Sequence, residues 1–205
     1  MLKLKYHLLL VSIIPFISIH LSFILSVQNE YLTLCNPYID GCYSISRVAR
    51  QPSSIVIFKI LMLVSAFFLF FLWSRLLKPN YNKILILIGR IGSLFLVVYI
   101  VALGEEGFLY ELMRRFGIFI FYILTLTSQW VFTLNIDIRK KRLFVTNFLL
   151  NIIVYLQILI FLVAIPFFLF IKNYGYIENI IEWWITLLIT LWFFINFIYC
   201  KKNDL

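Results

Sequence analysis

The chain has 205 residues, of which 63% are hydrophobic and 13% charged, with a mean hydropathy of +1.01. Soluble domains carry roughly 45–50% apolar and about 25% charged residues, so this composition excludes an ordinary water-soluble fold and predicts an integral membrane protein. The net charge of +9 suggests a nucleic-acid partner, but the basic residues lie between long apolar runs, where they indicate membrane topology instead.

Six apolar stretches are long enough to cross a bilayer as helices. Crossing a hydrocarbon core of about 30 Å takes roughly 20 helical residues. The stretches cover residues 8–27, 54–73, 84–104, 116–136, 143–171 and 183–199. Because no repeat interrupts this pattern, residues 1–205 are expected to form a single all-α transmembrane domain.

The short connections between these stretches differ in charge. The N-terminus, the loops at 75–83 and 139–142, and the C-terminus hold most of the lysines and arginines, whereas the other connections hold most of the acids. By the positive-inside rule, the basic side faces the cytoplasm. The sequence therefore predicts a six-helix bundle with both termini cytoplasmic, in a plasma membrane such as the bacterial inner membrane.

His20 lies within the first predicted span, flanked by Ser18 and Ser22. An intramembrane polar side chain either hydrogen-bonds to a neighbouring helix or serves a function, and both interpretations of His20 stay open. His7 is the other histidine of the chain, so a bis-histidine haem site is disfavoured. No cofactor is predicted.

The first outward loop, residues 28–52, contains Cys35 and Cys42. Pro37 and Gly41 are turn residues between them, so the two thiols can approach each other and form a disulfide in an oxidising compartment. The alternative is two unpaired thiols packed at the membrane surface. No metal site is predicted, because two thiolates without a nearby histidine do not complete a zinc shell.

Arg47 and Arg50 follow in the same loop, on the side where basic residues are disfavoured. A helical turn would present both on one face, since they are three positions apart. They either extend toward outer-leaflet phosphates or form a headgroup site, because a guanidinium binds phosphate through two parallel hydrogen bonds.

Residues 108–116, in the second outward loop, have apolar side chains at helical spacing and predict a short amphipathic helix on the outer membrane surface. Glu111 can pair with Arg114 or Arg115 along that helix. Alternatively, this loop and the arginines of the first outward loop form one polar pocket for a lipid headgroup. The candidate residues are Arg47, Arg50, Glu105, Glu106, Glu111, Arg114 and Arg115.

Both outward loops carry motifs of a known family. Ile45-Ser46, Pro52 and Phe58 resemble the first-loop signature of the Frag/DRAM/Sfk superfamily, which includes the GPI-lipid remodelling factors. The segments 103–110 and 113–117 are similar to forms in its bacterial members, and so is Ser44-Ile45-Ser46-Arg47 with Arg50. Where many eukaryotic members have a histidine before the glycine of the fourth helix, this chain has Arg114 and Arg115 before Gly117, so chemistry that rests on that histidine does not carry over.

The resemblance implies that the protein binds, senses or remodels lipid at the extracytoplasmic leaflet. Whether it is an enzyme stays open, because no base stands beside a nucleophile at any recognisable spacing. A second hypothesis is an accessory or assembly subunit of a larger membrane complex, or a homo-oligomer. A small solute transporter ranks third, because no acid lies in the middle of a predicted span.

Overall fold

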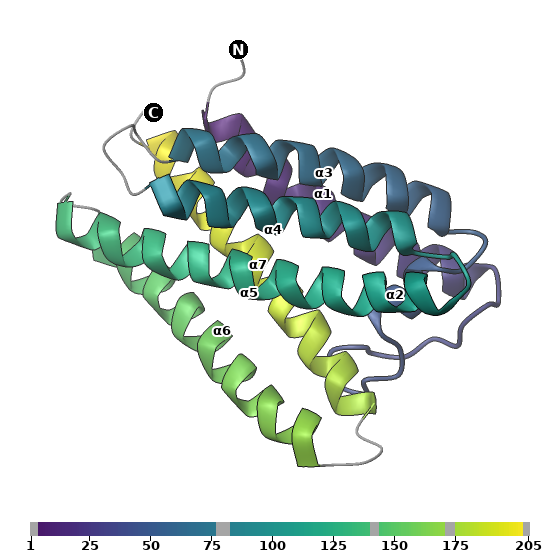
Figure 1. The fold of residues 1–205 in the computed structure, drawn as a ribbon. Helices are drawn as coiled ribbons and strands as arrows, with labels where there is room; N and C mark the ends of the chain where they lie inside the picture. Colours follow the sequence, from purple (N-terminus) through teal and green to yellow (C-terminus); the bar gives the residue numbers. More distant parts are fainter. Residues whose placement is uncertain (1–3, 77–82, 140–143, 171–174, 203–205) are drawn as a thin grey trace.

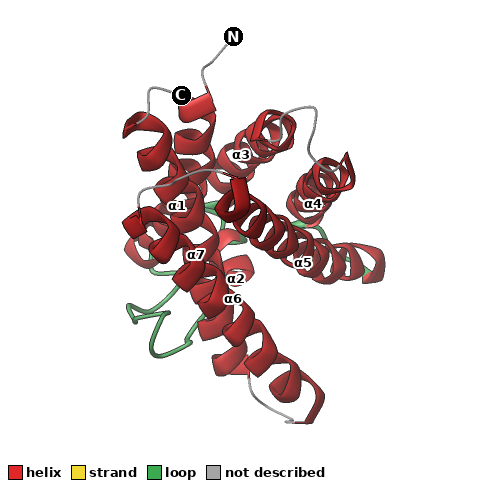
Figure 2. Cartoon of the chain, turned by 90° about the vertical axis from the view of Figure 1, so that its left-hand side faces the viewer, coloured by secondary structure: helices red, strands yellow, loops and turns green. Residues whose placement is uncertain are grey.

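The computed structural model describes residues 4–76, 83–139, 144–170 and 175–202. These residues form seven helices. Their bounds are α1 Leu4–Gln28, α2 Ile45–Ala49, α3 Ile55–Leu76, α4 Lys83–Ala102, α5 Phe108–Arg139, α6 Phe144–Phe170 and α7 Gly175–Lys202. Figure 2 shows that the described part of the chain is helical apart from its connections.

The long helices pack side by side as one bundle. Helix α1 lies between α3 and α7, α4 lies between α3 and α5, and α6 packs against α7 and α5 (Figure 1). Helix α1 begins and α7 ends at the same end of the bundle, whereas α2 and the α4–α5 turn lie at the opposite end (Figure 1). The arginines of the first outward loop and the charged turn between α4 and α5 therefore lie at the same end of the bundle.

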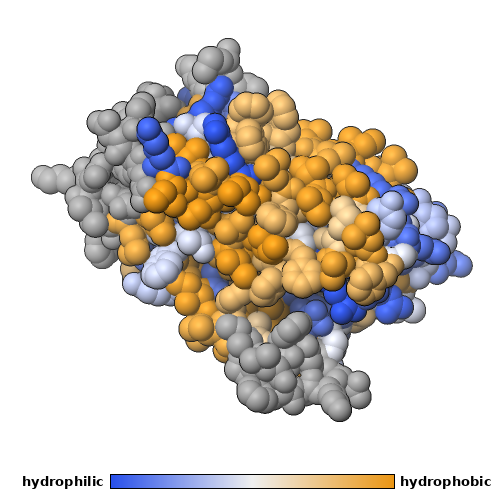
Figure 3. Space-filling model, in the orientation of Figure 1, coloured by the Kyte–Doolittle hydropathy of each residue, from blue (hydrophilic) through white to orange (hydrophobic). Residues whose placement is uncertain are grey.

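Five helices, α1, α3, α4, α5 and α7, are long and apolar enough to cross a membrane. The described side chains of α6 add a shorter apolar stretch, Phe148–Ala164. Large apolar side chains such as Phe67, Leu94 and Leu159 are exposed on the outside of the bundle. Figure 3 shows a broad hydrophobic band with hydrophilic residues toward both ends of the bundle. These features are those of a multi-pass α-helical membrane protein.

Two predicted boundaries change. The prediction of a separate short helix at 108–116 is wrong, because α5 runs without a break from Phe108 to Arg139. Helix α5 contains no proline that would break it. Gly117, just after the point where the short helix was expected to end, packs closely against the backbone of Tyr99 and continues the helix. Helix α7 begins at Gly175 rather than at residue 183. The predicted cytoplasmic loops at 75–83 and 139–142 lie largely outside the described residues.

Buried amides connect three helices inside the bundle. The Gln157 side chain donates to the side-chain oxygen of Gln129 at 3.0 Å, and Gln129 donates to the carbonyl of Ile189 at 3.2 Å. Away from water, an unpaired amide would cost free energy, so each amide is held by the next helix. This chain of hydrogen bonds fixes α5, α6 and α7 relative to one another.

Candidate functional site

A charged groove opens at the end of the bundle where α2 meets the α4–α5 turn. Its volume is about 910 Å³. The first turns of α5 form its third wall. The lining residues are Arg47, Arg50, Gln51, Gly104, Glu105, Glu106, Gly107, Phe108, Glu111 and Arg114. We call this depression the outer groove.

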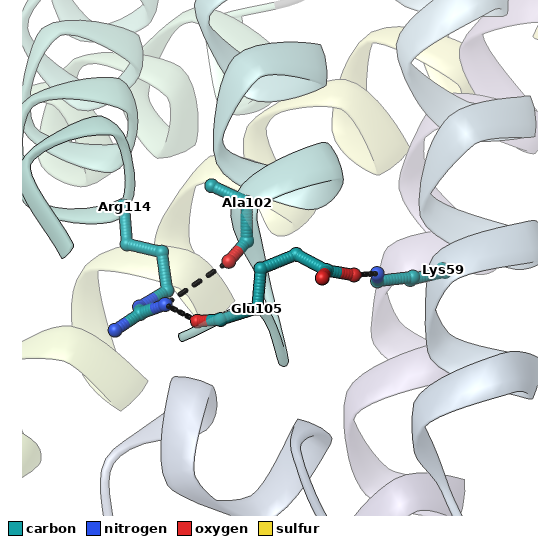
Figure 4. A network of polar contacts seen from close by, with 4 residues as sticks. All are labelled: Lys59, Ala102, Glu105 and Arg114. Atoms are coloured by element: carbon teal, nitrogen blue, oxygen red, sulfur yellow. Dashed lines mark hydrogen bonds and ion pairs between the residues drawn. The ribbon is translucent and has the colours of Figure 1, made fainter. Parts of the chain in front are cut away.

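The α4–α5 turn is held in place by Arg114. Its guanidinium donates to the carbonyl oxygens of Ala102 at 3.1 Å and Glu105 at 2.6 Å, while the Glu105 carboxylate pairs with Lys59 of α3 at 3.6 Å (Figure 4). The last carbonyls of a helix lack partners within the helix, and a cation there is favourable. Arg114 therefore caps α4 and gives the groove a positive charge.

The other two arginines of the groove are Arg47, in helix α2, and Arg50, which is the C-cap residue of that helix. The Ser44 hydroxyl accepts a hydrogen bond from the backbone N–H of Arg47 at 3.1 Å, as an N-cap residue does. The Arg47 guanidinium lies over the Tyr43 ring, 5.1 Å from its centroid. Arg50 uses its Nε to donate to the carbonyl of Ser46 at 3.1 Å. Both guanidinium groups keep terminal N–H donors for a ligand.

Glu182 of α7 binds the first residue of α2. Its carboxylate accepts a hydrogen bond from the backbone N–H of Ile45, the first residue of α2, at 3.1 Å. Sequence reasoning missed this role, because the two residues are 137 positions apart and no local pattern connects them. The only signal was an acid immediately before Trp183 and Trp184.

We expect Glu182→Ala to lower the free energy of unfolding by about 1 kcal/mol, because the Ile45 N–H loses its hydrogen-bond acceptor in a partly buried place. Thermal unfolding of the detergent-solubilised protein measures this loss. Glu178→Ala is the matched control, since this exposed acid lies one helical turn away on α7. Equal stability of the two variants would contradict the supporting role.

Arg115 is the one candidate residue that does not line the groove. Its side chain is 78% exposed and pairs with Glu111 at 2.7 Å. Six of the seven candidates, Arg47, Arg50, Glu105, Glu106, Glu111 and Arg114, surround the groove. The sequence left open whether Glu111 pairs with Arg114 or with Arg115, and the structure shows the pair with Arg115.

Cys35 and Cys42 are joined by a disulfide, and the loop that it closes is docked on α7. Three side chains of α7 donate to backbone carbonyls of the loop region. They are Asn179 to Gly41 at 2.7 Å, Trp183 to Tyr43 at 2.9 Å and Trp184 to Tyr38 at 3.0 Å. The loop thereby leads the chain from α1 across α7 to α2 in one fixed path.

His20 also binds this loop. Its Nε2 is 2.9 Å from the Tyr38 hydroxyl and its Nδ1 is 2.8 Å from the Phe16 carbonyl oxygen. The partner is a loop residue rather than a neighbouring helix. Burial raises the pKa of Tyr38 to about 12, so its hydroxyl stays protonated at neutral pH. A hollow beside His20, Tyr38 and Trp183 has a volume of only about 10 Å³, room for about one water molecule.

Among protein-family models, curated proteins and solved structures, none matches this chain. Within the described residues, no three or more His, Cys, Asp or Glu side chains gather where they could hold a metal ion. The outer groove, with its three arginines and three glutamates, is the feature on which a function is argued.

Proposed function

We propose that the protein crosses the plasma membrane six times with both termini in the cytoplasm. Five long apolar helices and the apolar stretch of α6 support six spans. The basic residues at the chain ends and at 139–142 support a cytoplasmic position for that end of the bundle. In this topology the outer groove faces the extracytoplasmic leaflet, as in a protein of the bacterial inner membrane.

The function that the groove supports best is the binding of a lipid headgroup, for sensing or remodelling of that lipid. The observation that carries this proposal is the meeting of Arg47, Arg50 and Arg114 around one groove at the end of the apolar band. Guanidinium groups bind phosphate oxygens through paired, charge-assisted hydrogen bonds. Phospholipid phosphates lie at the depth of such a groove, next to the hydrocarbon.

The resemblance to the Frag/DRAM/Sfk superfamily supports the same proposal. Several residues that carry it line the groove, among them Arg47, the segment 104–108 and Arg114. Gly117 belongs to the same motif, and a Cβ there would lie 3.0 Å from the backbone nitrogen of Tyr99. Glycine therefore allows α5 to approach α4 closely just below the groove. We propose that the chain is a bacterial-type member of this superfamily.

Native mass spectrometry of the protein extracted gently from its own membrane tests the proposal. We expect wild type to retain a specific phospholipid and the Arg47→Ala/Arg50→Ala variant to retain about tenfold less, because two phosphate contacts are lost. The matched control is Lys83→Ala, which removes an exposed basic side chain at the start of α4, the end of that helix opposite the groove.

Equal lipid retention by the groove variant and wild type would contradict headgroup binding. A bound protein partner without any selective lipid would favour the accessory-subunit alternative. Thermal unfolding of each variant shows whether a loss of lipid follows from a loss of fold, and Arg47 and Arg50 suit this test because their guanidinium groups make few contacts within the protein.

A further inference from the structure

The charges around the outer groove are only partly balanced within the protein. Its lining holds three carboxylates, those of Glu105, Glu106 and Glu111. Two of them have basic partners that do not line the groove. Glu105 pairs with Lys59 at 3.6 Å, and Glu111 pairs with Arg115 at 2.7 Å. Glu106 is left, and it makes no hydrogen bond or ion pair with the residues that the structure describes.

The three guanidinium groups of the groove are not neutralised either. Within the described ranges, none of Arg47, Arg50 and Arg114 forms an ion pair with a carboxylate. Arg114 donates to two neutral carbonyls, Arg50 to one, and Arg47 lies over an aromatic ring. The groove therefore presents three uncompensated positive charges and, on the facing turn, one uncompensated carboxylate.

A ligand that complements this pattern carries an anion and a cation a short distance apart. Resting on the proposed headgroup function, we propose that the outer groove selects a phospholipid whose phosphate is followed by a primary ammonium group, as in phosphatidylethanolamine. The phosphate diester binds the guanidinium groups of Arg47 and Arg50, and the ammonium group donates hydrogen bonds to Glu106. A headgroup with phosphate alone would leave Glu106 facing an anion.

The lining also distinguishes a primary ammonium from a quaternary one. Recognition of quaternary ammonium groups relies on several aromatic faces around the cation. Among the groove residues, Phe108 is the single aromatic, and it is 82% exposed rather than folded over the cavity. A carboxylate accepts hydrogen bonds from a primary ammonium, whereas a trimethylated one has none to donate. Choline headgroups are therefore expected to bind less well.

An apolar rim indicates that the ligand is a lipid rather than a soluble phosphate ester. Phe108 lines the groove, and Leu109 beside it on the first turn of α5 is 63% exposed. Apolar side chains next to a charged groove suit an amphipathic ligand, whose acyl chains cover what the headgroup does not. A lipid headgroup and a soluble phosphate ester would share the same chemistry, a phosphate linked to ethanolamine.

The test is native mass spectrometry of the full-length protein after delipidation and exchange into an equimolar mixture of phosphatidylethanolamine, phosphatidylcholine and phosphatidylglycerol with matched acyl chains. We expect phosphatidylethanolamine to be retained about fivefold over each of the others. Glu106→Gln should bring the three lipids to nearly equal retention without reducing total lipid. Glu178→Gln, which alters an exposed acid outside the groove, should retain the wild-type preference.

The outcomes separate this inference from the proposed function. Amine selection would be overturned if the protein preferred phosphatidylglycerol, or if Glu106→Gln left the lipid preference unchanged. In either case, lipid retention that depends on Arg47 and Arg50 would still support headgroup binding. Retention insensitive to Arg47→Ala/Arg50→Ala would overturn both. Soluble glycerophosphoethanolamine that displaced the lipid at equal concentration would show that the acyl chains contribute nothing, and would overturn the lipid as the ligand. Unfolding temperatures within a few degrees of wild type establish that each variant is folded.

Discussion

Replacing Gly41 with alanine is expected to detach the disulfide loop from α7 and to lower the free energy of unfolding by about 3 kcal/mol. Gly41 has a φ of +58°, a left-handed conformation that strains residues with a Cβ. An added Cβ would lie 2.0 Å from the carbonyl oxygen of Tyr176, which is backbone of α7 and cannot rotate away. The hydrogen bond from Asn179 to the Gly41 carbonyl would be lost with the contact.

Denaturation of the detergent-solubilised protein, followed by tryptophan emission, measures this effect. The indoles of Trp183 and Trp184 donate to the loop region, so detachment should also shift their emission to longer wavelength. Gly175→Ala is the matched control, because a Cβ there meets nothing within 4 Å. Asparagine tolerates left-handed φ, so wild-type stability of Gly41→Asn would show that strain, not the clash, is decisive.

The features predictable from sequence are those carried by local patterns. Long apolar runs predicted the long helices, five of which are long and apolar enough to cross a membrane. The turn residues Pro37 and Gly41 indicated that Cys35 and Cys42 could pair. The spacing of Arg47 and Arg50 indicated a helical turn, which the structure contains as α2. In each case the residues that determine the local structure lie close together in the chain, so a short segment of sequence is sufficient to predict it.

The contacts that build the groove could not be predicted in this way. Lys59 and Glu105 lie on different helices, and an apolar run does not specify which helix packs beside it. His20 binds Tyr38 because the disulfide loop folds back over α1, which depends on the path of the whole loop. Arg114 was expected to bind an acid or a ligand, but it also caps α4, since the close turn brings carbonyls within reach.

Replacing Gly89 with alanine is expected to lower the free energy of unfolding by about 3 kcal/mol through overpacking between α3 and α4. A Cβ at this position would lie 2.4 Å from Cγ of Trp73, at the base of the indole rather than at a flexible tip. Trp73 is fully buried and packs against Trp192 and Phe193, so the ring has no free space to move into. The helices must therefore separate.

Comparison with Gly92→Ala shows whether the clash is local. A Cβ at Gly92 would lie 3.2 Å from Cβ of Leu124, a contact that a small shift relieves, so a much smaller loss is expected. Trp73→Phe should partly rescue Gly89→Ala, since the smaller ring leaves room, and the double-mutant cycle measures that coupling. Additive losses would contradict a direct clash. Because Gly89 and Trp73 lie toward the end of the bundle opposite the outer groove, the folded Gly89→Ala protein should retain its lipid, which separates packing from ligand recognition.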